Sequence, residues 1–352
     1  MTAGGNQFLP EHKRAQPGRS VARLSAIGIA RLRFAVQACF TLFCLYAGYK
    51  FYCFYMWALD RSDTYVARPS SVEAFLPISA LLGLKRLVLT GQWDSVHPAG
   101  LTILIAAIAI AFFVRKGFCG WICPVGFISN LIEKLGRPVR LANTLPKGLD
   151  YPLLCLKYLL LAFFFYVVVL SMDLRAVEDF LRSSYNLAAD AKMLEFFLKP
   201  STLTVGVIAF LFLISFVVRN FWCRYLCPYG ALLGLPALIS PVQVKRKASR
   251  CIDCKKCENI CPASIRITAA ETLRHPECVG CMECVDICPQ ENCLSLQYYS
   301  KRRIPIRAVP VAVVLLFGLF YVAALATGHW HTTVPLDMMK RLYQSAATFV
   351  HP

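Results

Sequence analysis

The sequence is poor in acidic residues and lacks the common signatures of nucleotide-binding and hydrolytic enzymes. Only 20 of its 352 residues are Asp or Glu, against 38 Lys and Arg. No Walker box, Rossmann glycine run or hydrolase nucleophile motif occurs, so we expect no stand-alone enzyme of these classes. The net charge of +18 is not gathered into one patch with interleaved aromatics, which argues against a nucleic-acid partner. No small-residue cleavage site precedes the first apolar run, so we expect no removable signal peptide.

Hydrophobic residues make up 57% of the chain, and the mean hydropathy is +0.53, which indicates a membrane protein. A spanning helix needs about 20 mostly apolar residues. Five stretches meet this requirement, at residues 34–57, 98–114, 152–172, 202–218 and 308–327. A weaker stretch at 72–89 is interrupted by Pro77, Lys85 and Arg86, so it fits an interfacial or partly re-entrant helix better than a sixth span.

The positive charges near the ends of these stretches predict the orientation. Arg115 and Lys116 end the second stretch, and Arg219 and Arg224 follow the fourth. Under a five-span arrangement these residues, the basic residues before 34 and those at 301–307 all lie on one side, which the positive-inside rule assigns to the cytoplasm. We therefore predict a multi-pass protein of a bacterial cytoplasmic (inner) membrane, surrounded by membrane lipid, with its N-terminus cytoplasmic and its C-terminus extracytoplasmic.

Two short boxes resemble each other. Residues 118–126 are FCGWICPVG and residues 222–230 are WCRYLCPYG. Each box follows a span that is predicted to run inward, which favours a parallel internal repeat. The boxes carry four candidate redox or metal thiols, namely Cys119, Cys123, Cys223 and Cys227. Three uses remain open: redox-active thiols, a metal site shared by the repeat, or a structural turn with compact apolar cysteines.

The strongest signal is a C-x2-C-x2-C-x3-C-P array that occurs twice, beginning at Cys251 and at Cys278. In bacterial ferredoxins three closely spaced thiolates bind one [4Fe-4S] cluster, and the fourth binds the other cluster. The predicted metal ligands are therefore Cys251, Cys254, Cys257 and Cys288 for one cluster and Cys278, Cys281, Cys284 and Cys261 for the second. A zinc site is the alternative, but structural zinc sites usually pair two C-x2-C knuckles.

Residues near these arrays also carry predictions. The alternation of apolar and polar residues at 264–268 and 294–298 predicts two short, half-buried strands. We expect Cys293, which is outside the arrays, to be a small buried side chain. Cys39, Cys44, Cys53 and Cys155 lie within predicted spans, where we expect packing roles.

The predicted fold is a membrane all-α bundle of about five helices with an inserted small α+β ferredoxin domain of the bacterial 2[4Fe-4S] type. The domain boundaries follow from the motifs. They are a basic cytoplasmic N-terminal segment at 1–33, a membrane domain with four spans and both boxes at 34–244, the ferredoxin domain at 245–300, and a final span with an extracytoplasmic tail at 301–352.

Together the boxes and the arrays give the chain a family resemblance. From about residue 30 onward it resembles polytopic membrane ferredoxin proteins of the NapH and MauN type and the membrane half of the NosR type. The resemblance implies electron transfer beside a quinol-linked respiratory or maturation system. Because the large flavin-binding extracytoplasmic domain of the NosR type is missing, the resemblance implies no covalent flavin.

We expect an iron-sulfur protein that relays single electrons between a quinone pool or membrane partner and a soluble or peripheral redox protein, in an anaerobic-type respiratory chain. The alternative is an assembly factor that uses cluster electrons to reduce a metal or thiol while an oxidase or reductase matures. A third hypothesis is a structural anchor whose clusters only help the insert to fold.

Three histidines are candidates for the chemistry of a quinol. His97, His329 and His331 all lie at the predicted outer face, where a histidine could accept quinol protons. The alternative is that they are ordinary interface residues. Haem is not supported by a motif, because no C-x-x-C-H sequence occurs.

Overall fold

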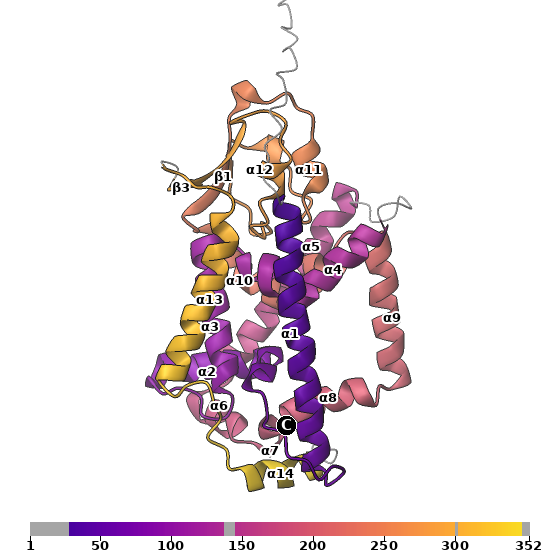
Figure 1. Ribbon diagram of the computed structural model, residues 1–352, viewed down its shortest axis with the longest axis vertical. Helices are drawn as coiled ribbons and strands as arrows, with labels where there is room; N and C mark the ends of the chain where they lie inside the picture. Colours follow the sequence, from indigo (N-terminus) through magenta and orange to yellow (C-terminus); the bar gives the residue numbers. More distant parts are fainter. Residues whose placement is uncertain (1–27, 137–144, 300–301, 347–352) are drawn as a thin grey trace, which may run out of the picture.

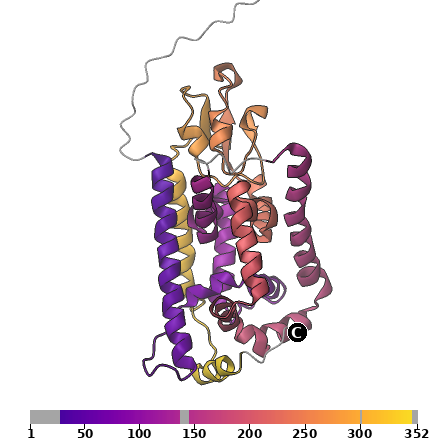
Figure 2. The ribbon, with the colours of Figure 1, turned by 90° about the vertical axis from the view of Figure 1, so that its right-hand side faces the viewer.

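The structure is a computed structural model that describes residues 28–136, 145–299 and 302–346. It consists of a helical bundle with a small unit of short strands and helices at one end (Figures 1 and 2). Most of the predicted basic N-terminal segment 1–33 lies outside the described residues, as do Arg137 and Arg140 in the predicted cytoplasmic loop.

Three helical segments in the described part of the chain are long and apolar enough to cross a membrane. They are α1 (Ile29–Ala58), the continuous segment Gly148–Ser171, which comprises α5 (Lys147–Phe165) and the π-helical turn η3 (Tyr166–Ser171), and α13 (Ala308–Ala326). A fourth is possible if α8 (Ala189–Leu198) and α9 (Thr202–Val217), which meet at 79°, form one span. The count is thus three or four, against the five spans that we expected.

The predicted second span is α3 (Pro98–Val114), a helix of 17 residues at the centre of the bundle. It is apolar on all sides, and Leu101, Ala107 and Ile110 are completely buried, as expected for a helix surrounded by protein. α3 ends at Arg115, whose φ of 61° turns the chain directly into the first box. This turn leaves α3 shorter than α1, which has 30 residues, and α13, which has 19.

The remaining helices of the bundle are short. They are η1 (Ser70–Phe75), α2 (Pro77–Thr90), α4 (Pro124–Gly136), α6 (Leu174–Leu181), α7 (Ser184–Leu187), α10 (Pro228–Leu238) and α14 (Leu336–Gln344). The weak stretch at 72–89 forms η1 and α2, and Pro77 is the first residue of α2. Lys85 on α2 donates hydrogen bonds to the carbonyls of Val168 (2.9 Å) and Val169 (3.0 Å), so its charge caps the loosened turn of η3.

The unit at the end of the bundle contains a four-stranded antiparallel sheet with the order β2-β1-β3-β4. Its strands are β1 (Val242–Arg246), β2 (Thr272–Leu273), β3 (Leu294–Tyr298) and β4 (Arg302–Arg303). The helical segments between them are η5 (Ala248–Arg250), α11 (Lys256–Ile260), η6 (Ile267–Ala269) and α12 (Glu283–Asp286).

One of the two predicted strands is confirmed and the other is wrong. β3 forms at the predicted residues 294–298. Residues 264–268 form no strand, because Ser264 has a φ of 50° and a 3-10 turn begins at Ile267. The alternation there has another cause, namely the burial of Ile265 and Ile267 beside exposed Arg266.

The sheet unit shares its hydrophobic core with the bundle. One cluster of buried side chains joins Val114 and Trp121 from the bundle to Val244 and Leu296 from the sheet. Val313 of α13 belongs to the same cluster and is completely buried. The unit therefore packs against the ends of the helices and is not an independent domain on a linker.

A second buried cluster holds the opposite end of the bundle. Arg68 forms ion pairs with Glu73 (2.9 Å) and Asp190 (2.7 Å), and the Tyr343 hydroxyl donates to Asp190 (2.6 Å). Tyr343 also packs edge-on against the ring of Phe54 on α1, which secures α14. Because each of these buried charges has a partner, we interpret the group as one that stabilises the fold.

Candidate electron-transfer site

Four of the eight array thiols surround a small pocket in the sheet unit. Its lining includes Cys251, Cys254, Cys257 and Cys288, the quartet that sequence spacing predicts for one cluster. Three of these come from the first array and the fourth from the end of the second. The crossed arrangement of ferredoxin arrays is therefore compatible with this pocket. We call this set the distal quartet.

The other four thiols, Cys261, Cys278, Cys281 and Cys284, are all buried. Burial, and then the neighbouring thiols of Cys281, Cys261 and Cys278, raise the pKa of Cys284 well above its ordinary value. A thiol that is costly to ionise alone becomes a stable thiolate once a metal centre supplies positive charge. We call this set the proximal quartet.

Both arrays use the same backbone device. The residue after the second cysteine has a positive φ, 55° at Lys255 and 64° at Met282, and each of these residues precedes a short helix that carries the third cysteine. Residues with side chains adopt this conformation rarely. The same backbone conformation at equivalent positions indicates that the two loops have the same shape, in which the three cysteines of each array lie around one point.

Two further observations concern metal binding. Among the described residues, no group of three or more His, Cys, Asp or Glu side chains is spaced to hold a single metal ion. Cys293 is buried, as predicted, and it lines the same pocket as the distal quartet.

The two boxes have the same local structure. Each begins with a π-helical turn, η2 (Phe118–Ile122) or η4 (Trp222–Leu226), and a proline then starts α4 or α10. Cys227 caps α10, because its sulfur accepts a hydrogen bond from the backbone N–H of Gly230 (3.3 Å). Proline at the first helical position and a capping side chain before it explain the Cys-Pro pair.

The first box rests directly on a loop of the proximal quartet. A Cβ at Gly120 would lie 2.2 Å from the carbonyl oxygen of Val279, so only glycine fits there. Trp121 donates its indole N–H to the Gly280 carbonyl (3.0 Å). Arg33 of α1 bonds the Gly120 carbonyl (2.9 Å) and pairs with Glu283 (2.9 Å). The loop between Cys278 and Cys281 is thereby pinned to the membrane bundle.

The second box and the residues directly before it, Arg219 and Asn220, hold the remaining ligand segment of the same quartet. Asn220 donates to the Pro262 carbonyl (3.0 Å), and Arg219 donates to the Cys261 carbonyl (3.1 Å). Arg224 donates to the carbonyl of Ala263. Both boxes therefore converge on the proximal quartet, one at each of its two segments.

A buried acid links this contact to the rest of the bundle. The carboxylate of Glu277, directly before Cys278, pairs with Lys116 (3.0 Å) and Lys157 (2.5 Å) and accepts a hydrogen bond from Tyr158 (2.8 Å). Burial works in the opposite direction, but the two lysines lower the pKa of Glu277 to about 2. Glu277 thus joins the proximal loop to α5 and to Lys116, which lies between α3 and the first box.

The sequence patterns did not predict the ion pairs that Glu277 forms with Lys116 and Lys157. Lys157 lies in the middle of the predicted span 152–172, and an ionisable residue inside a membrane helix is itself a signal of a buried partner. An acid immediately before a cluster cysteine, in a chain so poor in acids, is a second signal.

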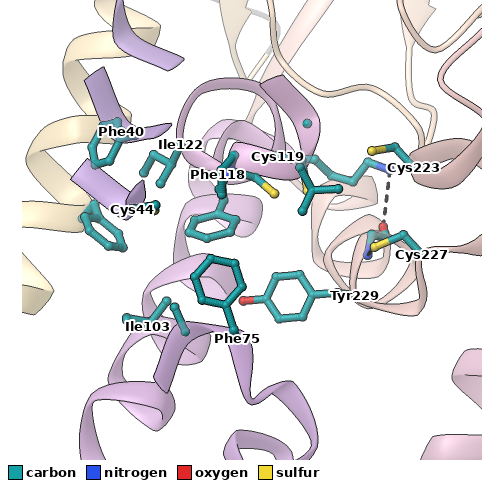
Figure 3. Close-up of a pocket in the computed structure, with 18 of the residues that line it drawn as sticks. Phe40, Cys44, Phe75, Ile103, Phe118, Cys119, Ile122, Cys223, Cys227 and Tyr229 are labelled. Carbon is teal, nitrogen blue, oxygen red and sulfur yellow. Dashed lines mark hydrogen bonds between the residues drawn. The ribbon is translucent and has the colours of Figure 1, made fainter. Parts of the chain in front are cut away.

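A large cavity of about 930 Å³ lies beneath the boxes, between α1, α3 and α13. All four box thiols line it, and so does Lys116. Figure 3 shows three of these thiols, those of Cys119, Cys223 and Cys227. Burial raises the pKa of Cys123 to about 11, and burial with the neighbouring Cys227 and Cys123 thiols raises that of Cys223 to about 12. The structure therefore brings the four predicted box thiols around one space.

Aromatic side chains form much of the cavity wall. Figure 3 shows the hydroxyl of Tyr229 pointing into the cavity near Phe75 and Phe118. This hydroxyl makes no hydrogen bond to any residue that the structure describes. At the other end the cavity reaches Ser70 and His331, whose Oγ and Nδ1 atoms are 3.1 Å apart.

The three candidate histidines have separate environments. His97 is 2% exposed, and its Nε2 lies 2.8 Å from the Asn186 carbonyl oxygen. The ring of His329 packs against that of Trp93 in a tilted arrangement, with 4.8 Å between ring centroids. Of these three histidines, only His331 lines the cavity. It is therefore the one that could accept a proton from a molecule bound there.

The cysteines predicted to be packing residues also differ. Cys39 and Cys44 on α1 line the cavity, although the sequence assigned them no other role. Cys155 is exposed on α5, and Cys53 is half-buried on α1.

Comparison with known proteins agrees with this architecture. A model described as a 4Fe-4S binding domain matches residues 96–141 and 200–247, the segments that contain the two boxes. A model described as a 4Fe-4S dicluster domain matches residues 243–289. No solved structure matches the chain.

Three relatives illustrate the range of similarity. The putative electron transport protein YccM of Escherichia coli is 38% identical over 297 residues, covering 82% of this chain and 83% of its own. The methylamine utilization ferredoxin-type protein MauN of Methylorubrum extorquens is 31% identical over 57% of this chain and 66% of its own. The ferredoxin-type protein NapH of Haemophilus influenzae is 28% identical over 51% of this chain and 58% of its own.

Apolar helices of membrane-spanning length, joined to an eight-cysteine dicluster unit, define a ferredoxin-type membrane protein. The chain belongs to the family of ferredoxin-type electron transport proteins that includes YccM, NapH, NirI, NosR and MauN. The resemblance inferred from the motifs is thus confirmed.

Proposed function

We propose that the protein relays single electrons between a carrier in its membrane cavity and a redox protein in solution, through the proximal and then the distal quartet. The observation that carries this order is the contact of both boxes with the proximal quartet. The same boxes line the cavity, so the proximal quartet is the nearer one to any molecule bound there.

Each quartet fits a [4Fe-4S] cluster. Cys251, Cys254, Cys257 and Cys288 would hold the distal cluster, and Cys261, Cys278, Cys281 and Cys284 the proximal one. The clusters would supply one-electron carriers at two successive positions. The protein's own contribution is to bury one centre against the membrane bundle and to leave the other near solvent.

A quinone or quinol is the membrane carrier that suits the cavity. A volume of about 930 Å³ is at the upper end of the range for small-molecule sites, and the wall is mainly apolar and aromatic. Oxidation of a quinol releases two electrons and two protons. Tyr229 offers a free hydroxyl to a quinone oxygen, while His331 and Ser70 offer a route for the protons toward the opposite end of the cavity.

The arrangement in the membrane follows from the charge pattern. The ferredoxin unit at 245–300 and the segment 1–33 would be cytoplasmic, and the tail after α13 extracytoplasmic, in a bacterial inner membrane. The matching local structure of the two boxes supports a parallel repeat within 34–244. An arrangement with five membrane crossings requires two further spans. One would be α3 with the turns at its ends, and the other would be the bent pair α8–α9. Reporter fusions at the two ends of α13 test this orientation.

A second candidate function is supported by the box thiols themselves. Four thiols around one cavity would suit an assembly factor that passes electrons to a metal ion or a thiol of a maturing oxidase or reductase. Serine at Cys119 and Cys223 separates the two functions. Loss of metal-ion reduction with unchanged quinol oxidation would favour the assembly role.

The order of the relay can be tested with one cysteine from each quartet. Protein purified without oxygen should contain about eight iron and eight sulfide per chain. With a soluble quinol such as decylubiquinol, Cys254→Ser should still reduce the proximal cluster, whereas Cys281→Ser should block electron arrival at the distal cluster. Paramagnetic resonance distinguishes the two centres. Normal reduction of the distal cluster in Cys281→Ser would overturn the order.

A further inference from the structure

The distal quartet has an exposed surface that the proximal quartet lacks. Cys254 is exposed, and its neighbour Ile252 is 51% exposed. All four proximal cysteines are buried. An exposed apolar residue beside the outer ligand loop provides a place where a second redox protein could approach closely.

Basic side chains surround this place. Lys247, Arg250, Lys255 and Lys256 are all exposed. Lys255 lines the pocket of the distal quartet, and the backbone N–H of Lys247 bonds the carbonyl of Cys293, which lines the same pocket.

The basic charges on this surface outnumber the acidic ones. Arg250 donates to the Glu291 carbonyl (3.3 Å), which places Glu291 on the same surface. Glu291 and Asp253 are the acids of this surface, against the four basic side chains. We call residues 247, 250, 252, 255 and 256 the basic rim.

Membrane topology does not account for the basic rim. The positive-inside rule concerns charges near the ends of spans, whereas these residues belong to the unit at the far end of the bundle (Figures 1 and 2). An apolar centre with a charged rim is typical of transient interfaces, in which charge guides the approach and a small apolar contact brings the redox centres together.

We propose that the basic rim is the docking surface for an acidic, soluble one-electron carrier protein. This inference rests on the proposed function, because it requires a cluster at the distal quartet. The acidic partner is drawn in by long-range attraction, docks over Ile252 and exchanges one electron with the distal cluster.

The test uses the full-length protein in nanodiscs of uncharged lipid, with its clusters reduced by dithionite. The probes are horse cytochrome c, which is basic, and the same cytochrome with succinylated lysines, which is acidic. At low salt the acidic form should be reduced about tenfold faster or more, and the difference should collapse at high salt. Each reduced cluster loses one electron, and each haem iron gains one.

Two variants with the same change in charge decide where the attraction arises. Lys247→Glu with Lys256→Glu changes two exposed side chains of the basic rim that do not line the pocket of the distal quartet, and it should abolish or reverse the preference for the acidic probe. Arg175→Glu with Arg182→Glu changes two exposed residues at α6, at the opposite end of the molecule (Figure 1), and should leave the preference intact. Equal effects of the two variants would mean that only net charge acts, which would overturn the proposal.

A small mediator, phenazine methosulfate, serves as the internal control. Both variants should keep the wild-type cluster signal and the wild-type rate of reoxidation by the mediator. If the mediator reoxidises the wild-type clusters but neither cytochrome is preferred, the docking proposal fails alone. If the wild-type protein has no reducible clusters, the proposed function fails as well.

Discussion

The two cysteine quartets share one sequence spacing, yet the proximal quartet is enclosed by the membrane bundle while the distal quartet borders solvent. Box residues, Glu277 and the core contact of Trp121 surround the proximal loops. Cys254 and Ile252 of the distal side are exposed. The difference teaches that two sets of cysteines with equal spacing can acquire unequal surroundings, packed helices for one and solvent for the other.

The strongest test of this contrast removes the buried charge on the proximal side. Glu277→Gln leaves Lys116 and Lys157 without a countercharge, and breaking a buried ion pair in this way costs about 3 kcal/mol or more. The matched change on the distal side is Glu291→Gln, an exposed residue, for which we expect less than about 0.5 kcal/mol. Chemical unfolding of the detergent-solubilised protein, followed by circular dichroism, measures both. Similar losses for the two variants would refute the contrast.

A somewhat smaller effect is expected from the close contact at Gly120. Gly120→Ala adds a Cβ that would meet the Val279 carbonyl at 2.2 Å, so the box and the loop must separate. Overpacking of this kind costs about 1–3 kcal/mol, and the proximal cluster signal should decline while the distal signal persists. Gly148→Ala is the control, because no atom lies within 4 Å of its added Cβ. An intact proximal signal in Gly120→Ala would contradict the close contact.

Loss of a single hydrogen bond should have a still smaller effect. Trp121→Phe keeps one buried aromatic ring but removes the five-membered ring of the indole, and with it the N–H that donates to the Gly280 carbonyl (3.0 Å). We expect a loss of about 1–2 kcal/mol, because a buried carbonyl loses its partner. Arg250→Gln removes an exposed hydrogen bond on the distal side and should change the unfolding free energy by less than about 0.5 kcal/mol. Thermal melts of the two variants give the comparison.

The dependence on pH sharpens the role of Glu277. Its pKa in the folded protein, about 2, lies below the ordinary value for glutamate, so its stabilisation is fully present above the unfolded pKa and is lost as pH falls toward 2. The gap in unfolding free energy between wild type and Glu277→Gln should therefore be fully present at pH 5 to 6, where the lysines are charged in the wild type. It should shrink only below about pH 4. A gap that closes near pH 6 would show that another group is responsible.

Much of the site followed from local patterns. The eight array cysteines, the boxes and the apolar stretches are recognisable because ligand spacing and hydropathy are properties of short segments. The strand at 294–298 was predicted for the same reason. The strand expected at 264–268 does not form, because alternating burial also occurs in the loop after Cys261, where Ser264 turns the chain.

Other features depend on residues far apart in the chain, and no short pattern contains them. The fit of Gly120 under Val279, the meeting of Lys116 and Lys157 at Glu277, and the cavity between α1, α3 and α13 arise only when the helices pack. The role of His331 as the cavity histidine, in place of His97 or His329, was decided in the same way.

By itself, then, the sequence determined the kind of protein: apolar segments for a membrane, two thiol arrays of the ferredoxin type, and two boxes of the same form. The tertiary structure alone decided which quartet is buried against the helices and which borders solvent. The physical reason is that thiolate spacing governs what a loop can bind, whereas burial and charge around that loop come from neighbours that only folding brings into contact.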